Sequence, residues 1–235
     1  MKSDEMSFWD HLEELRRRIL PVMLVFCAAT AIAFFFSGKA IPFFVRPLLE
    51  LGGRLIAVNP VEKFMAYLKI AMVAGLFAAF PLAAAQFALF VKPALVSGEK
   101  AMLIPSVLAS FFLGLLGAAF SLFVLTPFAF GFFASFARGD GIDNLWSFGA
   151  CVDLSVTLLS ASVLAFQFPW LLGAAMKLGV VKVQTLVKYR RHVIVAVFMI
   201  AAVITPPDIF SQSVVALVLW ALFEVTVLFG RIKGG

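Results

Sequence analysis

Charged side chains are scarce in this sequence. Lysine, arginine, aspartate and glutamate make up 14% of the 235 residues, whereas 63% are hydrophobic and the mean hydropathy is +1.06. A soluble domain of this length could not bury so much apolar surface. The apolar residues form continuous runs rather than alternating with polar ones, which excludes a transmembrane β-barrel. Helices are the other structure that satisfies the backbone in lipid, so the sequence predicts an all-α polytopic membrane protein.

Cysteine and histidine are also rare, with two of each. Cys27 and Cys151 lie in or beside apolar runs, where small packed side chains are expected, and neither belongs to a metal-binding motif. His11 and His192 lie outside the apolar runs, and the sequence has no G-x-S-x-G, H-E-x-x-H or phosphate-binding loop. We therefore expect no cofactor, no metal site and no enzymatic activity.

The apolar runs predict six transmembrane helices within a single integral membrane domain, residues 1–235. Helices 5 and 6 are expected to be short. The apolar part of helix 5, Val193–Ile204, is only roughly 18 Å long at 1.5 Å per residue, against roughly 30 Å of hydrocarbon. An even number of spans leaves both termini on the same side of the membrane. The predicted spans are residues 19–36, 64–90, 102–133, 154–176, 190–204 and 209–229.

The positive charges are distributed unequally between the two sides of this predicted topology. Thirteen of the 19 lysines and arginines fall in the two termini, the loop between helices 2 and 3, and the loop between helices 4 and 5. The positive-inside rule therefore places both termini in the cytoplasm. We expect the protein in the cytoplasmic (inner) membrane. The same bias, together with anionic lipid, explains the pI near 9.6, so we do not expect a nucleic-acid partner.

Two segments on the opposite, outer side are expected to have structure of their own. Residues 37–62 contain apolar patches separated by charges and three prolines, and we expect short helices lying against the outer surface. Thr205-Pro206-Pro207-Asp208 forms a tight turn between the two short helices, because two consecutive prolines cannot lie inside a helix. A short hairpin with a polar tip suggests a surface for partners rather than a plain anchor.

Four motifs, in order along the chain, resemble the TatC family, the polytopic subunit of the twin-arginine protein translocase. No single motif is specific for this family. Four motifs in the family's order, spread over nearly the whole chain with the six-helix layout, are specific when taken together. The motifs are His11–Arg18 (HLEELRRR), Phe90–Leu95 (FVKPAL) followed by Glu99-Lys100, Phe166–Pro169 (FQFP), and Thr205–Asp208 (TPPD) followed by Phe210–Gln212 (FSQ).

The resemblance implies a receptor core that exports folded proteins. It implies binding of signal peptides with paired arginines at the cytoplasmic face, TatA- and TatB-type single-span partners, a homo-oligomeric receptor complex in the lipid bilayer, and transport driven by the proton-motive force. A small-solute secondary transporter or a membrane scaffold is the alternative that we keep open. A transporter would also show broken helices and polar residues at the membrane midplane.

The resemblance also implies which residues bind the signal peptide. A receptor for two guanidinium groups needs carboxylates at the cytoplasmic interface, since a carboxylate accepts two parallel hydrogen bonds from arginine but not from lysine. Glu14 has an alternative explanation, a pair with Arg17 or Arg18 on its own helix. The implied signal-peptide site consists of Glu14, Arg16, Phe90, Pro93 and Glu99.

Two further groups of polar residues are singled out by the resemblance. Thr205, Asp208 and Gln212 form the implied contact with partner helices, although Asp208 could equally cap helix 6. Gln167 lies near the middle of the fourth predicted span, at a position where many family members carry glutamate. An amide cannot ionise, which argues against proton uptake there. A hydrogen bond between helices and a role in drawing water into the membrane remain equally open.

Overall fold

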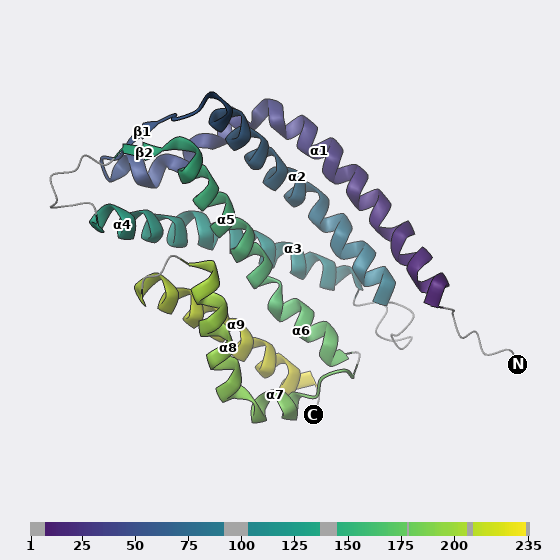
Figure 1. Ribbon diagram of the computed structural model, residues 1–235. Helices are drawn as coiled ribbons and strands as arrows, with labels where there is room; N and C mark the ends of the chain where they lie inside the picture. The colour runs from purple at the N-terminus through teal and green to yellow at the C-terminus, as the bar shows by residue number, and fades with distance from the viewer. Residues whose placement is uncertain (1–7, 92–102, 137–144, 178, 206–208, 234–235) are drawn as a thin grey trace, which may run out of the picture.

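The computed structural model describes residues 8–91, 103–136, 145–177, 179–205 and 209–233. Helices dominate, and one two-stranded sheet joins segments that are far apart in the sequence. The elements in chain order are α1 (Phe8–Glu50), β1 (Arg54–Ile56), α2 (Pro60–Val91), α3 (Leu103–Phe120), a π-helical turn (Ser121–Leu125), α4 (Thr126–Phe136), β2 (Leu145–Ser147), α5 (Phe148–Phe166), α6 (Phe168–Lys177), α7 (Val183–Lys188), α8 (Arg190–Ile204) and α9 (Ile209–Lys233) (Figure 1).

The predicted class, an all-α polytopic membrane protein, is confirmed. Five helical stretches in the described part of the chain are long and apolar enough to cross a membrane. The short helix predicted at 190–204 is α8, whose 15 residues give roughly 22 Å at 1.5 Å per residue. The last helix, α9, extends beyond the predicted residue 229 and has 25 residues, so only the first helix of the C-terminal hairpin is short. The five stretches are 13–50, 60–89, 104–135, 148–177 and 209–232.

The expectation of short surface helices in residues 37–62 is wrong. Helix α1 continues through Pro42 and Pro47 to Glu50, because its continuation buries Phe44, Val45 and Leu48 against α2, α4 and α5. Proline removes an amide donor from a helix, but burial of three large apolar side chains offsets that loss. The Ser155 hydroxyl of α5 also donates a hydrogen bond to the carbonyl oxygen of Phe44, at 2.9 Å.

The apolar patch near Leu55 forms a strand instead of a helix. Strand β1 pairs in parallel with β2, with Arg54 opposite Leu145 and Ile56 opposite Ser147. Helix α2 then begins at Pro60, earlier than the predicted residue 64, since proline is favoured in the first turn of a helix. The sheet therefore joins the segment before α2 to the segment before α5 (Figure 1).

The carboxylate of Glu62 joins the starts of α2 and α5, and we call this connection the carboxylate clamp. Glu62 Oε2 accepts hydrogen bonds from the amides of Val58 at 2.8 Å and Asn59 at 3.3 Å, which caps the start of α2. Glu62 Oε1 accepts from the Gly149 amide at 2.6 Å and from the Ser147 hydroxyl. The carboxylate therefore ties the start of α2 to the start of α5, and an ion pair between Lys69 and Asp153, at 2.5 Å, repeats the connection further along both helices.

Helices α1 and α2 pack antiparallel through two glycines. A Cβ atom at Gly75 would lie 2.1 Å from Thr30 Oγ1 and 2.9 Å from Thr30 N, so the two backbones approach as closely as glycine permits. A Cβ atom at Gly38 would lie 3.3 Å from the Tyr67 ring. Thr30 is level with Gly75 and Gly38 with Tyr67, and these two contacts fix the register of the pair.

The third long helix changes its neighbours at the π-helical turn. Before the turn, Gly117 of α3 lies against α5, where an added Cβ would be 2.9 Å from the Ser162 carbonyl oxygen. Leu125 at the end of the turn and Ala129 of α4 join Leu158 of α5 in a core cluster that holds α8 and α9. The hairpin contributes five buried residues to this cluster, namely Val197, Ala201, Val215, Ala216 and Leu219.

The contact between Glu62 and Gly149 predicts a stability effect. In Gly149→Ala the added methyl group would lie 2.3 Å from Glu62 Cγ, so the clamp must open. We expect a loss of about 1–3 kcal/mol, measured as a lower melting temperature of the detergent-purified protein. The matched control is Gly131→Ala in α4, where nothing lies within 4 Å of the added atom. Equal melting temperatures for the two variants would contradict the clamp.

Candidate functional site

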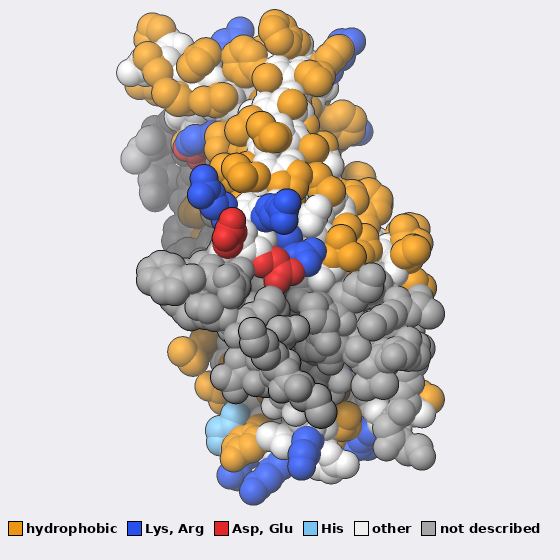
Figure 2. All heavy atoms as spheres, turned by 90° about the vertical axis from the view of Figure 1, so that its right-hand side faces the viewer, with side chains coloured by type: hydrophobic (Ala, Val, Ile, Leu, Met, Phe, Trp, Pro, Cys, Tyr) orange, Lys and Arg blue, Asp and Glu red, His pale blue; other side chains and the backbone are white. Residues whose placement is uncertain are grey.

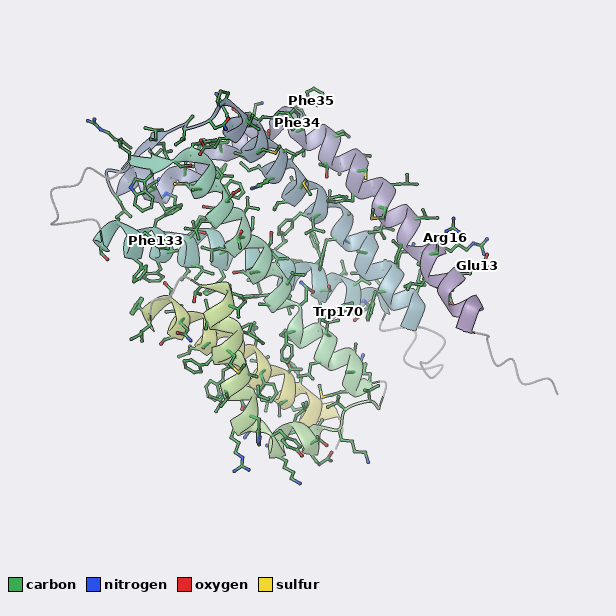
Figure 3. The ribbon with its side chains drawn as sticks, in the orientation of Figure 1. Glu13, Arg16, Phe34, Phe35, Phe133 and Trp170 are labelled. Carbon is green, nitrogen blue, oxygen red and sulfur yellow. The ribbon has the colours of Figure 1, made fainter. Side chains whose placement is uncertain are left out.

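The register of α1 and α2 places the first predicted site residue beside the end of α2. Glu14 lies as many residues before Thr30 as Val91 lies after Gly75, so the antiparallel pair brings Glu14 level with the last turn of α2. Figure 1 shows the start of α1 and the end of α2 side by side. Arg16 is exposed at this end and points away from the bundle with Glu13 (Figure 3).

Glu14 forms an ion pair within its own helix, which was the alternative explanation for this residue. Arg18, one turn further along α1, donates from Nη2 and, at 3.1 Å, from Nε to Glu14 Oε1. Both side chains are about one-quarter exposed. Glu14 is therefore already bonded to one guanidinium group, in a position that solvent reaches. Seen from the right of Figure 1, acidic and basic side chains gather below a large apolar surface (Figure 2).

The side chains of the other three residues of the implied signal-peptide site lie outside the described part of the structure. Phe90 belongs to the last turn of α2, but its side chain lies outside the described part of the structure. Pro93 and Glu99 fall in residues 92–102, which are also outside it. The structure thus brings together Glu14, Arg16 and the backbone of Phe90.

Gln167 lies at a break between two helices and forms a hydrogen-bonded pair with α3. Its side-chain oxygen accepts from the Ser110 hydroxyl at 2.8 Å, and its amide nitrogen donates to the Ser110 carbonyl oxygen at 3.2 Å. Both residues are buried. The break itself follows from Pro169, which cannot donate a helical hydrogen bond. An amide both donates and accepts, so it satisfies Ser110 in a way that an ionised glutamate could not.

Sequence reasoning missed the partners of Gln167 on α3. Trp170 of α6 donates from Nε1 to the Ser106 hydroxyl at 2.8 Å, and its ring lies 5.3 Å from that of Phe87, between centroids. Ser106, Ser110 and Gly114 follow one another at four-residue spacing on α3, and the last two both lie against Gln167. This row of small residues at helical spacing was a readable signal for a close helix contact.

The polar residues of the hairpin bond within the hairpin. The Thr205 hydroxyl donates to the Ala201 carbonyl oxygen at 2.8 Å, and Gln212 Nε2 of α9 donates to the Phe198 carbonyl oxygen of α8 at 3.2 Å. Asp208 lies outside the described residues. At the other end of the hairpin, Arg190 Nη2 forms an ion pair with Glu224 Oε2 at 2.5 Å.

These features define a class of protein. The chain is a polytopic helical membrane protein with a mixed-charge surface at one end, a carboxylate clamp at the other and a short hairpin on one side. The described residues contain no group of three metal-ligating side chains.

Comparisons with known proteins identify the family. The model of the Sec-independent protein translocase protein TatC matches residues 10–217. TatC of Azotobacter chroococcum is 35% identical over 233 residues, which cover 96% of this chain and 89% of that protein. TatC of Aquifex aeolicus is 32% identical over 234 residues, covering 97% and 95%, and that of Escherichia coli K12 is 28% identical over 228 residues, covering 96% and 88%.

Solved structures agree with the sequence comparison. A crystal structure of the twin arginine translocase receptor TatC matches with a TM-score of 0.82 at 32% identity, covering 94% of this chain and 99% of that one. The chain belongs to the TatC family. It is therefore a membrane component of a protein translocase and not an enzyme.

The bond between Gln167 and Ser110 predicts energetic coupling between the two residues. In a double-mutant cycle of Gln167→Leu and Ser110→Ala, we expect a coupling free energy of about 0.5–1.7 kcal/mol, measured from unfolding in detergent. Ser135→Ala, at the far end of α4, serves as the control partner and should combine additively with Gln167→Leu. If Ser110→Ala also combines additively with Gln167→Leu, the hydrogen bond contributes nothing to the free energy of unfolding.

Proposed function

We propose that this protein is the receptor subunit of a twin-arginine translocase and binds signal peptides at the end of the molecule formed by the start of α1 and the end of α2. One observation carries the proposal: the α1–α2 register brings Glu14 level with the last turn of α2. That turn leads directly into the segment with Pro93 and Glu99. Two carboxylates supplied by separate segments suit two neighbouring guanidinium groups.

The pair between Glu14 and Arg18 suggests how the site distinguishes arginine from lysine. Glu14 Oε1 already accepts from two nitrogens of one guanidinium group, so the carboxylate is oriented for arginine. A signal-peptide arginine can replace Arg18 by exchanging one guanidinium for another, which keeps the carboxylate bonded throughout. A lysine ammonium is a compact point charge and does not reproduce the planar fork.

The orientation follows from the distribution of charge. The mixed-charge end carries Arg16, Arg17 and Arg18, and the ends of α6 and α9 carry further cations. By the positive-inside rule, both termini lie in the cytoplasm and the clamped end faces the outer side of the cytoplasmic membrane. With α8 counted as the sixth span, this gives an even number of crossings.

The C-terminal hairpin is the proposed contact for TatA- and TatB-type partners. The apolar side chains Val195, Met199 and Val203 recur at helical spacing along α8 and are 60%, 66% and 87% exposed. At the tip, the proposed polar contacts are Thr205, Asp208 and Gln212. A single-span helix with a polar group near its outer end matches a face of this kind. Several copies of the receptor would assemble with such partners to export folded cargo.

The short helix also suggests how the bilayer is prepared for transport. An α8 of roughly 22 Å beside roughly 30 Å of hydrocarbon makes the membrane thinner locally, which lowers the barrier for hydrophilic cargo. Transport would be driven by the proton-motive force. Gln167 carries no ionisable group, so the proton that drives transport is not taken up at this residue.

The first test addresses Glu14. Photo-crosslinking in membrane vesicles compares an Arg-Arg signal peptide with its Lys-Lys version. We expect Glu14→Gln and Glu99→Ala each to weaken capture of the Arg-Arg peptide by at least about 10-fold, as for a charge-assisted hydrogen bond. The matched control is Glu50→Gln, which removes the same i,i+4 type of pair from the opposite end of α1. Equal capture of both peptides by all variants would favour a transporter or a scaffold.

The exchange of guanidinium groups predicts a gain of affinity. Arg18→Gln frees Glu14 from its internal partner and should strengthen capture of the Arg-Arg peptide several-fold. Arg17→Gln removes the same charge from the neighbouring position and serves as the control. The two variants are compared by titrating the peptide against vesicles and measuring half-maximal crosslinking. If both variants gain the same affinity for the peptide, the gain comes from the change in net charge, and the exchange of guanidinium groups is contradicted.

The thinning hypothesis is tested by lengthening α8. Four leucines inserted into Val193–Ile204 add about 6 Å and one turn, so the faces of the helix stay nearly in register. We expect transport of a folded cargo into vesicles to fall strongly while crosslinking of the signal peptide is unchanged. Normal transport by the lengthened protein would show that the short span has no part in the mechanism.

A further inference from the structure

The break between α5 and α6 contacts α2 and α3 at two successive levels. At the first level, a Cβ atom built on Gly114 of α3 would lie 3.4 Å from Gln167 Nε2 and 3.6 Å from the ring of Phe80 on α2. Three segments therefore meet at this glycine, whose missing side chain allows the close approach. The contact lies one turn of α3 beyond Ser110, which is hydrogen-bonded to Gln167.

Trp170 forms the second level, in the first turn of α6. Its indole Nε1 donates to the Ser106 hydroxyl of α3 at 2.8 Å, and its ring centroid lies 5.3 Å from that of Phe87 on α2. Ser106 precedes Gly114 by eight residues and Phe87 follows Phe80 by seven, so the second level lies about two turns beyond the first on both helices. One side chain thus connects the end of α2 to the start of α3 (Figure 3).

The indole N–H gives this connection a fixed geometry. The side chain of Trp170 is partly buried, and a tryptophan in such a place needs an acceptor for its N–H, which the Ser106 hydroxyl supplies. A phenylalanine ring would keep the aromatic contact with Phe87 but would have no donor for Ser106. The hydrogen bond therefore determines how the ring lies between α2 and α3.

The end of α2 that Trp170 contacts is the end that lies beside Glu14. Phe87 is one turn before Val91, the last residue of α2. The register of α1 and α2 brings Glu14 level with that last turn. A displacement of Phe87 therefore changes what borders the Glu14 carboxylate.

We infer that Trp170 is a positioning residue for the signal-peptide site, an inference that rests on the proposed function. Two parallel hydrogen bonds from a guanidinium group require the carboxylate to be aligned with it, whereas a lysine ammonium is a point charge that tolerates displacement. Loosening the end of α2 should therefore weaken the binding of arginine more than that of lysine. A purely structural contribution of Trp170 would change the thermal stability and leave the preference for arginine as it is.

The test measures this preference in membrane vesicles that contain the whole protein, by titrating Arg-Arg and Lys-Lys signal peptides and recording half-maximal crosslinking. Trp170→Phe keeps the ring and removes the indole N–H. We expect capture of the Arg-Arg peptide to weaken about threefold to tenfold, the size of one hydrogen bond, while capture of the Lys-Lys peptide is unchanged. The matched control is Trp146→Phe at the clamped end, where the indole ring lies 6.2 Å from that of Phe130, between centroids.

The acceptor of the hydrogen bond provides a second set of variants. Ser106→Ala should cause the same loss as Trp170→Phe, and Ser106→Thr, which keeps the hydroxyl, should retain the native preference. The double variant Trp170→Phe/Ser106→Ala should lose no more than either single variant, because both changes remove the same bond. Additive losses would contradict the inference.

The failure of this inference is distinguishable from the failure of the proposed function. If the native protein prefers the Arg-Arg peptide and Trp170→Phe keeps that preference, Trp170 has no positioning role and only this inference is overturned. The same holds if Trp170→Phe weakens the capture of both peptides equally. If the native protein itself captures both peptides equally, the proposed function is overturned and this inference with it.

Discussion

The absence of water around the backbone is the constraint on which this structure depends. In lipid every amide and carbonyl must find a partner within the protein, and an uninterrupted helix achieves this by itself. The breaks are therefore informative. At Gln167 the backbone amide donates to the Leu164 carbonyl oxygen and the side chain satisfies Ser110. At the end of α8 the Thr205 hydroxyl and Gln212 bond to carbonyl groups of α8. Polar side chains thus lie where the helices stop.

The two ends of the molecule treat charge in opposite ways. At the clamped end, Glu62 is held by four donors from three segments, and its task is to fix α2 against α5. At the other end, Arg16 and Arg17 are exposed. Glu14 is bonded to Arg18 of the same helix, and both side chains are about one-quarter exposed. The carboxylate at one end joins two helices, whereas the ion pair of Glu14 at the other end lies within a single helix.

The sequence predicted most of the helices because hydrophobic runs carry that information directly. The range 190–204 is the same in prediction and structure, since the charged loop and the prolines on either side mark its ends. The prediction for residues 37–50 was wrong because it relied on the prolines in this segment. Burial of Phe44 and Leu48 outweighs the local preference of proline for ending a helix. The strand pair was missed because three residues per strand give no alternating pattern, and the partners lie about 90 residues apart.

The candidate site was predicted unevenly for related reasons. Glu14 and Arg16 were located by a motif, and the glycine contact at Thr30 then showed what lies beside them. The partner of Gln167 needed a distance between two helices, which no single run of residues contains. Ser110 nevertheless belongs to a row of small residues with helical spacing, so this part was within reach of the sequence.

The π-helical turn between α3 and α4 gives one long helix two different neighbours. In the turn, the Thr126 amide bonds to the Ser121 carbonyl oxygen, five residues back instead of four. One additional residue rotates everything beyond it by about 100° about the helix axis. Gly117 before the turn faces α5, whereas Leu125 at the end of the turn and Ala129 beyond it reach the hairpin. A rotation that would otherwise need a loop is thus made by a single extra residue, without exposing the backbone to lipid.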